Sequence, residues 1–226
     1  MKFESFEFHP AVAAGVRAAG FVSPTPIQAQ AVAPVMKGRD VMGLAQTGTG
    51  KTAAFALPIL HRLAGRPHGR PGALIVAPTR ELAEQIEQAV RALGKKTGLV
   101  ALAIYGGVSI KPQIEKLRRG VDIVVACPGR LLDHIGRGTI DLSGIETLVL
   151  DEADQMFDMG FLPDIRRLLK HHPGVLRRAR DRFRNYALLQ PRFRRRCLLC
   201  RKIGKSSRRR APRQGGGGSG HRYESG

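Results

Sequence analysis

The chain has 226 residues, of which 38 are Lys or Arg and 18 are Asp or Glu, so its formal net charge is +20. Hydrophobic residues make up 42% of it, which is enough for a packed core and excludes a wholly disordered protein. No apolar run reaches the roughly 18 residues of a membrane span, and three cysteines are too few for a disulfide framework. Met1–Ser5 carries an acid and leads into no apolar segment, so no secretory signal is expected. Together these features predict a cytoplasmic protein without a membrane partner.

The first 172 residues alternate between helical and strand-like segments. Apolar residues recur at helical spacing, often between a leading Pro and a closing Gly, at 10–20, 26–36, 51–62, 79–93, 111–119, 128–135 and 162–172. Short apolar runs predict strands at 41–44, 73–77, 99–104, 123–126 and 147–150. The intervening segment 65–72 is rich in Gly, Pro and Arg, which is typical of an exposed loop.

This alternation predicts the fold class. Short, continuously apolar strands separated by helices indicate an α/β protein in which helices cover both faces of a parallel sheet, giving three layers. Ligands of such sheets bind in the loops beyond the C-terminal ends of the strands. We expect residues 1–38 to lead into one domain over 39–172, followed by a separate region over 173–226.

A glycine-rich turn follows the first predicted strand. Residues 45–52 read Ala-Gln-Thr-Gly-Thr-Gly-Lys-Thr and match the P-loop pattern, with Ala at the usual first Gly. In a P-loop the backbone N–H groups and the helix N-terminus bind phosphate, Lys51 pairs with the β- and γ-phosphates, and Thr52 binds Mg²⁺. An ordinary strand-to-helix turn is the alternative reading. We favour a nucleotide site formed by Thr47, Gly48, Thr49, Gly50, Lys51 and Thr52.

A second acidic motif follows the last predicted strand. Asp151 and Glu152 open the sequence Asp-Glu-Ala-Asp at residues 151–154. An acidic N-cap of a helix would explain these residues without a ligand. Downstream of a P-loop, however, Asp151 is suited to hold Mg²⁺ and Glu152 to orient and deprotonate the attacking water. The pair of motifs therefore predicts an ATPase in which Glu152, Lys51 and Asp151 are catalytic.

These residues resemble the DEAD-box ATP-dependent RNA helicases of bacteria. Residues 151–154 spell the signature of that family, and residues 20–28 resemble its Q motif, with Phe3 placed 17 residues before Gly20. Residues 78–83, 106–107 and 128–130 resemble its motifs Ia, GG and Ib in the expected order. The resemblance spans residues 3 to about 172 and implies the N-terminal RecA-like domain of such an enzyme.

The resemblance implies roles for further residues. Gln28 would read the adenine edge of ATP, because an amide both donates and accepts hydrogen bonds, and Phe3 and Phe21 would stack near the base. RNA would be bound through its backbone, with little sequence specificity. The implied RNA contacts are Pro78, Thr79, Arg80, Gly107, Pro128, Gly129 and Arg130.

Two features depart from the family. Cys127 stands where motif Ib usually begins with Thr, and a thiol is a weak hydrogen-bond donor, so one phosphate contact is expected to be weaker. No Ser-Ala-Thr motif follows the acidic motif, and no second RecA-like domain with an arginine finger follows either. An arginine finger is worth roughly 10³–10⁵ in rate, so we expect ATP binding to survive while turnover nearly vanishes.

The last 54 residues carry most of the charge. Residues 1–172 hold 21 basic and 16 acidic residues, whereas residues 173–226 hold 17 and 2 and have no helical or strand periodicity. This composition predicts a disordered Arg- and Gly-rich tail. The tail is either an RNA-tethering extension or the result of a lost reading frame or a truncation. We favour frame loss or truncation, because a tethering tail should not replace half of an enzyme. A non-enzymatic basic RNA-binding protein is the alternative function; nothing in the sequence identifies a protein partner.

Overall fold

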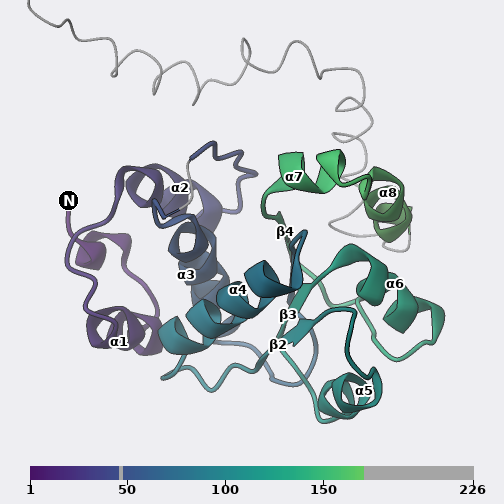
Figure 1. Ribbon diagram of the computed structural model, residues 1–226. Coiled ribbons are helices and arrows are strands. Elements are labelled where there is room, and N and C mark those ends of the chain that lie inside the picture. Colours follow the sequence, from purple (N-terminus) through teal and green to yellow (C-terminus); the bar gives the residue numbers. More distant parts are fainter. Residues whose placement is uncertain (46–47, 171–226) are drawn as a thin grey trace, which may run out of the picture. The chain divides into compact units, whose positions relative to one another are not determined.

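The apolar runs form a four-stranded parallel sheet in the computed structural model, which describes residues 1–45 and 48–170 (Figure 1). The strands lie in the order β2-β3-β1-β4, and every neighbouring pair is parallel. Val76 at the end of β1 lies opposite Ala126 of β3 and Leu150 of β4, so these strands end at the same level. The strands are β1 (Ala73–Val76), β2 (Ala101–Ile104), β3 (Ile123–Ala126) and β4 (Thr147–Leu150).

Nine helical segments accompany the sheet within the described residues. Most begin or end close to the predicted positions, because Pro, Thr or Gly stands at the boundary. Two short ones were not predicted: the 3₁₀ helix η1 (Phe3–Phe6) and α7 (Ala153–Asp158). The others are α1 (Pro10–Ala18), α2 (Pro26–Met36), α3 (Lys51–Leu63), α4 (Arg80–Leu93), α5 (Lys111–Arg118), α6 (Pro128–Gly136) and α8 (Leu162–Lys170).

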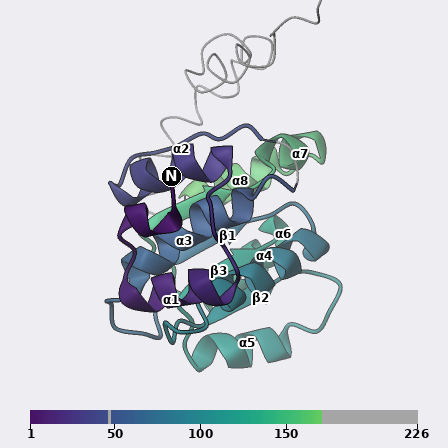
Figure 2. The same ribbon diagram turned by 90° about the vertical axis from the view of Figure 1, so that its left-hand side faces the viewer.

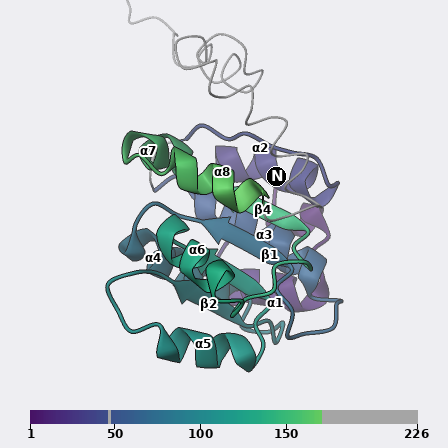
Figure 3. The ribbon, with the colours of Figure 1, turned by 90° about the vertical axis from the view of Figure 1, so that its right-hand side faces the viewer.

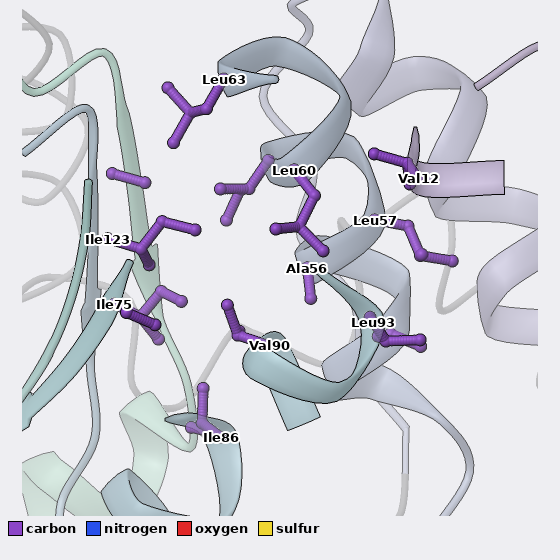
Figure 4. Packing of buried hydrophobic residues seen from close by; sticks show 14 of the residues in the cluster. Val12, Ala56, Leu57, Leu60, Leu63, Ile75, Ile86, Val90, Leu93 and Ile123 are labelled. Carbon is purple, nitrogen blue, oxygen red and sulfur yellow. The ribbon is translucent and has the colours of Figure 1, made fainter. Parts of the chain in front are cut away.

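Helices cover both faces of the sheet, as expected for a three-layer α/β fold. The side towards the viewer in Figure 2 carries α1, α2 and α3, whereas the opposite side, in Figure 3, carries α5, α6 and α8. Along each strand, alternate residues enter different hydrophobic clusters. Ile75 and Ile123 point towards Leu60 of α3 and Val90 of α4 (Figure 4). Leu74 and its alternating neighbours pack in the other cluster, with α6 and α8.

The predicted strand at 41–44 is wrong, since the structure has no strand there. Val41, Met42 and Leu44 are exposed instead, and the segment does not join the four-stranded sheet. An apolar run becomes a strand only where another strand is placed to pair with it. In the described residues β2 and β4 are the two edge strands of the sheet.

Several expectations fall on residues outside the described part of the chain. They concern Thr47, the predicted end of the last helix at 171–172, and the region 173–226. Within the described part, none of the helices combines the length and the apolar character that a membrane crossing needs.

Candidate ATP and RNA site

The motif residues gather at one edge of the sheet because all four strands are parallel. Thr79 and Arg80 follow β1, Gly106 and Gly107 follow β2, the segment 128–130 follows β3, and Asp151 follows β4. Each of these motifs therefore emerges at the C-terminal end of its strand. This is the edge at which parallel α/β sheets bind ligands.

The phosphate segment begins α3 with two glycines in left-handed backbone conformations. Gly48 has φ +80° and Gly50, the N-cap of α3, has φ +88°. Side chains strongly disfavour these angles, so glycine is required at both positions. Lys51 and Thr52 are then the first two residues of a 13-residue helix whose apolar face is buried. The positive end of that helix and its free N–H groups favour an anion at this point.

Gln28 links α2 to the phosphate segment. Its side chain is only 3% exposed; its Nε2 donates to the Gly50 carbonyl at 3.1 Å, and its Oε1 accepts from the Thr25 N–H at 2.9 Å. A Cβ on Gly50 would lie 2.4 Å from the same Nε2, so the contact is close. Here the amide that was predicted to read adenine fixes the turn that was predicted to hold phosphate.

The two predicted aromatic residues occupy different environments. The Phe3 ring is buried in the hydrophobic cluster that contains Ile75 and Ile123. Its centroid lies 5.6 Å from that of Phe21, with 33° between the ring planes. Phe21 is half-buried. Only Phe21 of the pair therefore presents accessible ring surface, and Phe3 supports it from inside.

Asp151 lies close enough to Lys51 for their charges to interact. Burial raises the pKa of Asp151 above its ordinary value, and the positive charge of Lys51 partly opposes this rise. The two residues are far apart in sequence, yet the fold brings them together at the sheet edge. A half-buried carboxylate suits Mg²⁺, and the nearby lysine suits phosphate oxygens bound together with such an ion.

Glu152 has an unusual backbone. Its φ is +49° and its ψ is +48°, which is the left-handed region, and it is the N-cap of α7. Its N–H donates to Asp151 Oδ1 at 3.2 Å. A non-glycine residue in this region costs about 1 kcal/mol or more, and such strain is concentrated at functional sites.

The loop after β1 presents Arg80 beside an aromatic ring. Thr79 caps α4 by accepting the Leu82 N–H at 3.2 Å. Arg80 Nε donates to Glu84 at 3.2 Å, and its guanidinium carbon lies 4.8 Å from the Tyr105 ring centroid. A hydrogen bond from Tyr105, together with the one from Arg80, lowers the pKa of Glu84. The guanidinium stays exposed while its direction is fixed by these two neighbours.

The loops after β2 and β3 are joined through Arg130. Gly107 is exposed with φ +77°, Gly129 is exposed, and Pro128 is buried at the start of α6. Arg130, however, points inward: its Nη2 donates to the Val108 carbonyl at 2.9 Å, and only 11% of its side chain is exposed. The structure thus brings the predicted RNA residues to one region but gives Arg130 an internal partner.

Sequence reasoning missed four residues of this region: Glu84, Tyr105, Gln113 and His134. Gln113 and His134 are buried polar residues whose side chains contact each other. A signal for Gln113 existed, because it stands between Ile110 and Leu117 at a spacing that places it on the apolar stripe of a helix. A polar residue on such a stripe indicates a buried hydrogen bond.

Comparison with known proteins identifies the family that these motifs resemble. A family model described as DEAD/DEAH box helicase matches residues 25–184, and so extends beyond residue 172. The ATP-dependent RNA helicase RhlB of Xanthomonas oryzae pv. oryzae is 48% identical over 178 residues, which cover 76% of this chain and 31% of that protein.

Two further relatives show the same pattern of coverage. The ATP-dependent RNA helicase DeaD of Mycobacterium tuberculosis is 48% identical over 76% of this chain and 30% of its own length. The ATP-dependent RNA helicase CshA of Listeria monocytogenes is 46% identical over 76% of this chain and 33% of its own length. The chain therefore spans about a third of the length of the curated relatives it matches.

Proposed function

The chain belongs to the DEAD/DEAH box helicase family, and from that premise we propose that residues 1–170 act as the ATP- and RNA-binding domain of an ATP-dependent RNA helicase. The observation that carries the proposal is the convergence of the phosphate segment and the acidic motif, with Lys51 near enough to influence the pKa of Asp151. The names of the relatives, all ATP-dependent RNA helicases, support it.

The proposed nucleotide site uses the start of α3 and the end of β4. Backbone N–H groups at residues 48–52 and the Lys51 ammonium bind the phosphates of ATP, while Thr52 and Asp151 hold Mg²⁺. An ion held there would supply positive charge that offsets the charge of the phosphates. Glu152 orients the attacking water and accepts its proton, and Phe21 packs against the base.

The proposed RNA surface lies along the neighbouring loops. Arg80 and the N–H groups of the exposed residues Gly107 and Gly129 suit phosphate oxygens, which are present at every nucleotide. Contacts of this kind bind RNA through its backbone and not through its sequence.

Phosphate release from ATP, measured with and without RNA, tests this function. We expect release to be slow, as the sequence predicts, but stimulated by RNA and lowered further by Glu152→Gln, since a general base contributes about 10²–10⁴-fold. The variant keeps the size of the side chain, so its affinity for an ATP analogue should match that of the parent chain. Release that is insensitive to both RNA and Glu152→Gln would contradict the proposal.

A second candidate function rests on the charge of residues 173–226, which hold 17 basic and 2 acidic residues. A basic, non-enzymatic RNA-binding protein would bind RNA equally with and without ATP and would lose that binding when 173–226 is deleted. Its affinity would also fall steeply with salt. That set of results would favour this second function.

A further inference from the structure

The loop at residues 105–110 is held by side chains that bind its carbonyl oxygens. Gln113 Nε2, on α5, donates to the Tyr105 carbonyl at 3.2 Å and to the Ser109 carbonyl at 3.5 Å. Arg130 Nη2, on α6, donates to the Val108 carbonyl at 2.9 Å. Three carbonyls of a short loop are thus bound from two helices.

Gln113 is itself fixed by His134, which is completely buried on α6. His134 Nε2 lies 3.3 Å from Gln113 Oε1, and His134 Nδ1 lies 2.8 Å from Thr139 Oγ1. Because the Gln113 amide nitrogen donates to the loop, its oxygen must accept, so the Nε2 atom of His134 carries the hydrogen. Burial lowers the pKa of His134, so its ring is neutral near pH 7. The single hydroxyl hydrogen of Thr139 can then point to Nδ1 at 2.8 Å or to the His134 carbonyl at 3.1 Å.

The Arg130 guanidinium is not presented to solvent. Only 11% of the side chain is exposed, its Nε lies 3.7 Å from Asp133, and its Nη1 is buried with no hydrogen-bond partner among the described residues. Gly106 and Gly107, by contrast, are exposed. The loop therefore turns its carbonyls towards Gln113 and Arg130 and leaves its glycines accessible.

We propose that Gln113, Arg130 and His134 are positioning residues that fix the 105–110 loop against α6, so that the exposed backbone at Gly107 and Gly129 forms one RNA-phosphate surface. The inference rests on the proposed RNA-binding function. It changes the role of Arg130, which binds the loop and not the RNA. It also assigns a positioning role to Gln113 and His134, which act through the hydrogen bonds of their uncharged side chains.

Hydrogen exchange of the full chain, with and without a single-stranded RNA, tests the proposal locally, so that RNA binding by the basic residues 173–226 does not mask the result. The segments to follow are 105–110 and 127–131. Gln113→Met and Arg130→Met remove the loop contacts at similar side-chain length. Arg118→Met, at the far end of α5, removes an exposed charge and serves as the matched control.

We expect RNA to protect both segments in the parent chain and in the Arg118→Met variant. In Gln113→Met and Arg130→Met alike, this protection should fall by about tenfold, the factor expected when a net hydrogen bond or two is lost. His134→Leu should give the same loss, whereas His134→Gln, which keeps an N–H donor, should retain protection. Exchange in β1 and β3, followed in the same samples, shows that each variant is folded.

Two results would overturn the inference in different ways. Full protection in Gln113→Met together with loss in Arg130→Met would mean that Arg130 binds phosphate directly, which leaves the RNA-binding function intact. Absence of RNA protection at both segments in the parent chain would refute the RNA-binding function itself, and the positioning role with it.

Discussion

The RNA-side loops and the nucleotide-side segments lie at the same edge of the sheet, but they are held differently. Thr79 caps the helix after β1, and Gln113 and Arg130 both fix the loop after β2, through hydrogen bonds to backbone groups. On the nucleotide side, Gln28 binds the Gly50 carbonyl, and Lys51 and Asp151 interact through their charges. Hydrogen bonds to the backbone therefore preorganise both the proposed RNA surface and the phosphate segment, and the nucleotide side adds an interaction between charges that a bound ligand would pair.

Gln28 offers the largest expected effect on stability on the nucleotide side. Gln28→Met leaves the partly buried Thr25 N–H and Gly50 carbonyl without these partners, which should cost about 1–3 kcal/mol of unfolding free energy. Affinity for an ATP analogue should fall by about tenfold, since the phosphate segment loses its link to α2. Denaturant unfolding and nucleotide titration measure the two effects; unchanged nucleotide affinity would show that this link is dispensable.

His134 gives the corresponding test on the RNA side. Its pKa is lowered by burial and by the nearby charge of Arg130, with Arg137 acting in the same direction and Asp133 opposing. The unfolded chain therefore gains a proton at higher pH than the folded chain, so stability should decline as the pH falls below about 6.5.

His134→Leu removes this contribution. The variant should lose about 1–3 kcal/mol near pH 7.5, because Gln113 Oε1 loses its partner and Thr139 Oγ1 keeps only the backbone carbonyl of residue 134, but its stability should depend less on pH. Thermal unfolding between pH 5.5 and 7.5 measures both changes. An equal pH dependence in the parent and the variant would rule out His134 as the titrating group.

Glu152 tests whether the nucleotide side stores backbone strain. Glu152→Gly and Glu152→Ala both remove the carboxylate, but only glycine adopts φ +49° readily. The glycine variant should be more stable than the alanine variant by about 1 kcal/mol, or a few degrees in Tm for a chain of this size. Equal midpoints, or a less stable glycine variant, would show that the conformation carries no strain.

Asp151 gives the smallest expected effect. Because burial raises its pKa, the charged carboxylate costs stability, and that cost is complete above the folded-state pKa. Asp151→Asn should therefore raise stability at pH 7.5, by no more than about 1 kcal/mol given the partial exposure and the nearby Lys51. The gain should disappear below the ordinary pKa of an aspartate. A destabilised variant at pH 7.5 would show that the Lys51 attraction outweighs burial.

The sequence predicted the sheet and the position of the motifs because both depend on local patterns. A short apolar run such as 123–126 and the start of α6 just after it are enough to place a motif at a strand end. The run at 41–44 looked similar but forms no strand, since pairing depends on a neighbour elsewhere in the chain. The local sequence pattern does not show whether such a neighbouring strand is present.

The sequence also did not show in which direction a polar side chain points. Arg130 was predicted to bind RNA from its motif, yet its guanidinium reaches the Val108 carbonyl, 22 residues earlier in the chain. The sequence around His134 is that of an ordinary helix, and its hydrogen-bond partner Gln113 lies in a different helix. Such contacts depend on the packing of α5 and α6 against the sheet, which periodicity alone does not define.

A double-mutant cycle on Lys51 and Asp151, read out as affinity for an ATP analogue with Mg²⁺, tests the central claim most directly. Lys51→Met alone should weaken binding by about 10- to 100-fold, as expected for a charge-assisted contact, and Asp151→Asn should weaken it in a Mg²⁺-dependent way. Because both residues serve one bound nucleotide, the effects should be non-additive by at least about 0.5 kcal/mol. Strictly additive effects, or binding that neither substitution alters, would contradict a shared site between the phosphate segment and the acidic motif.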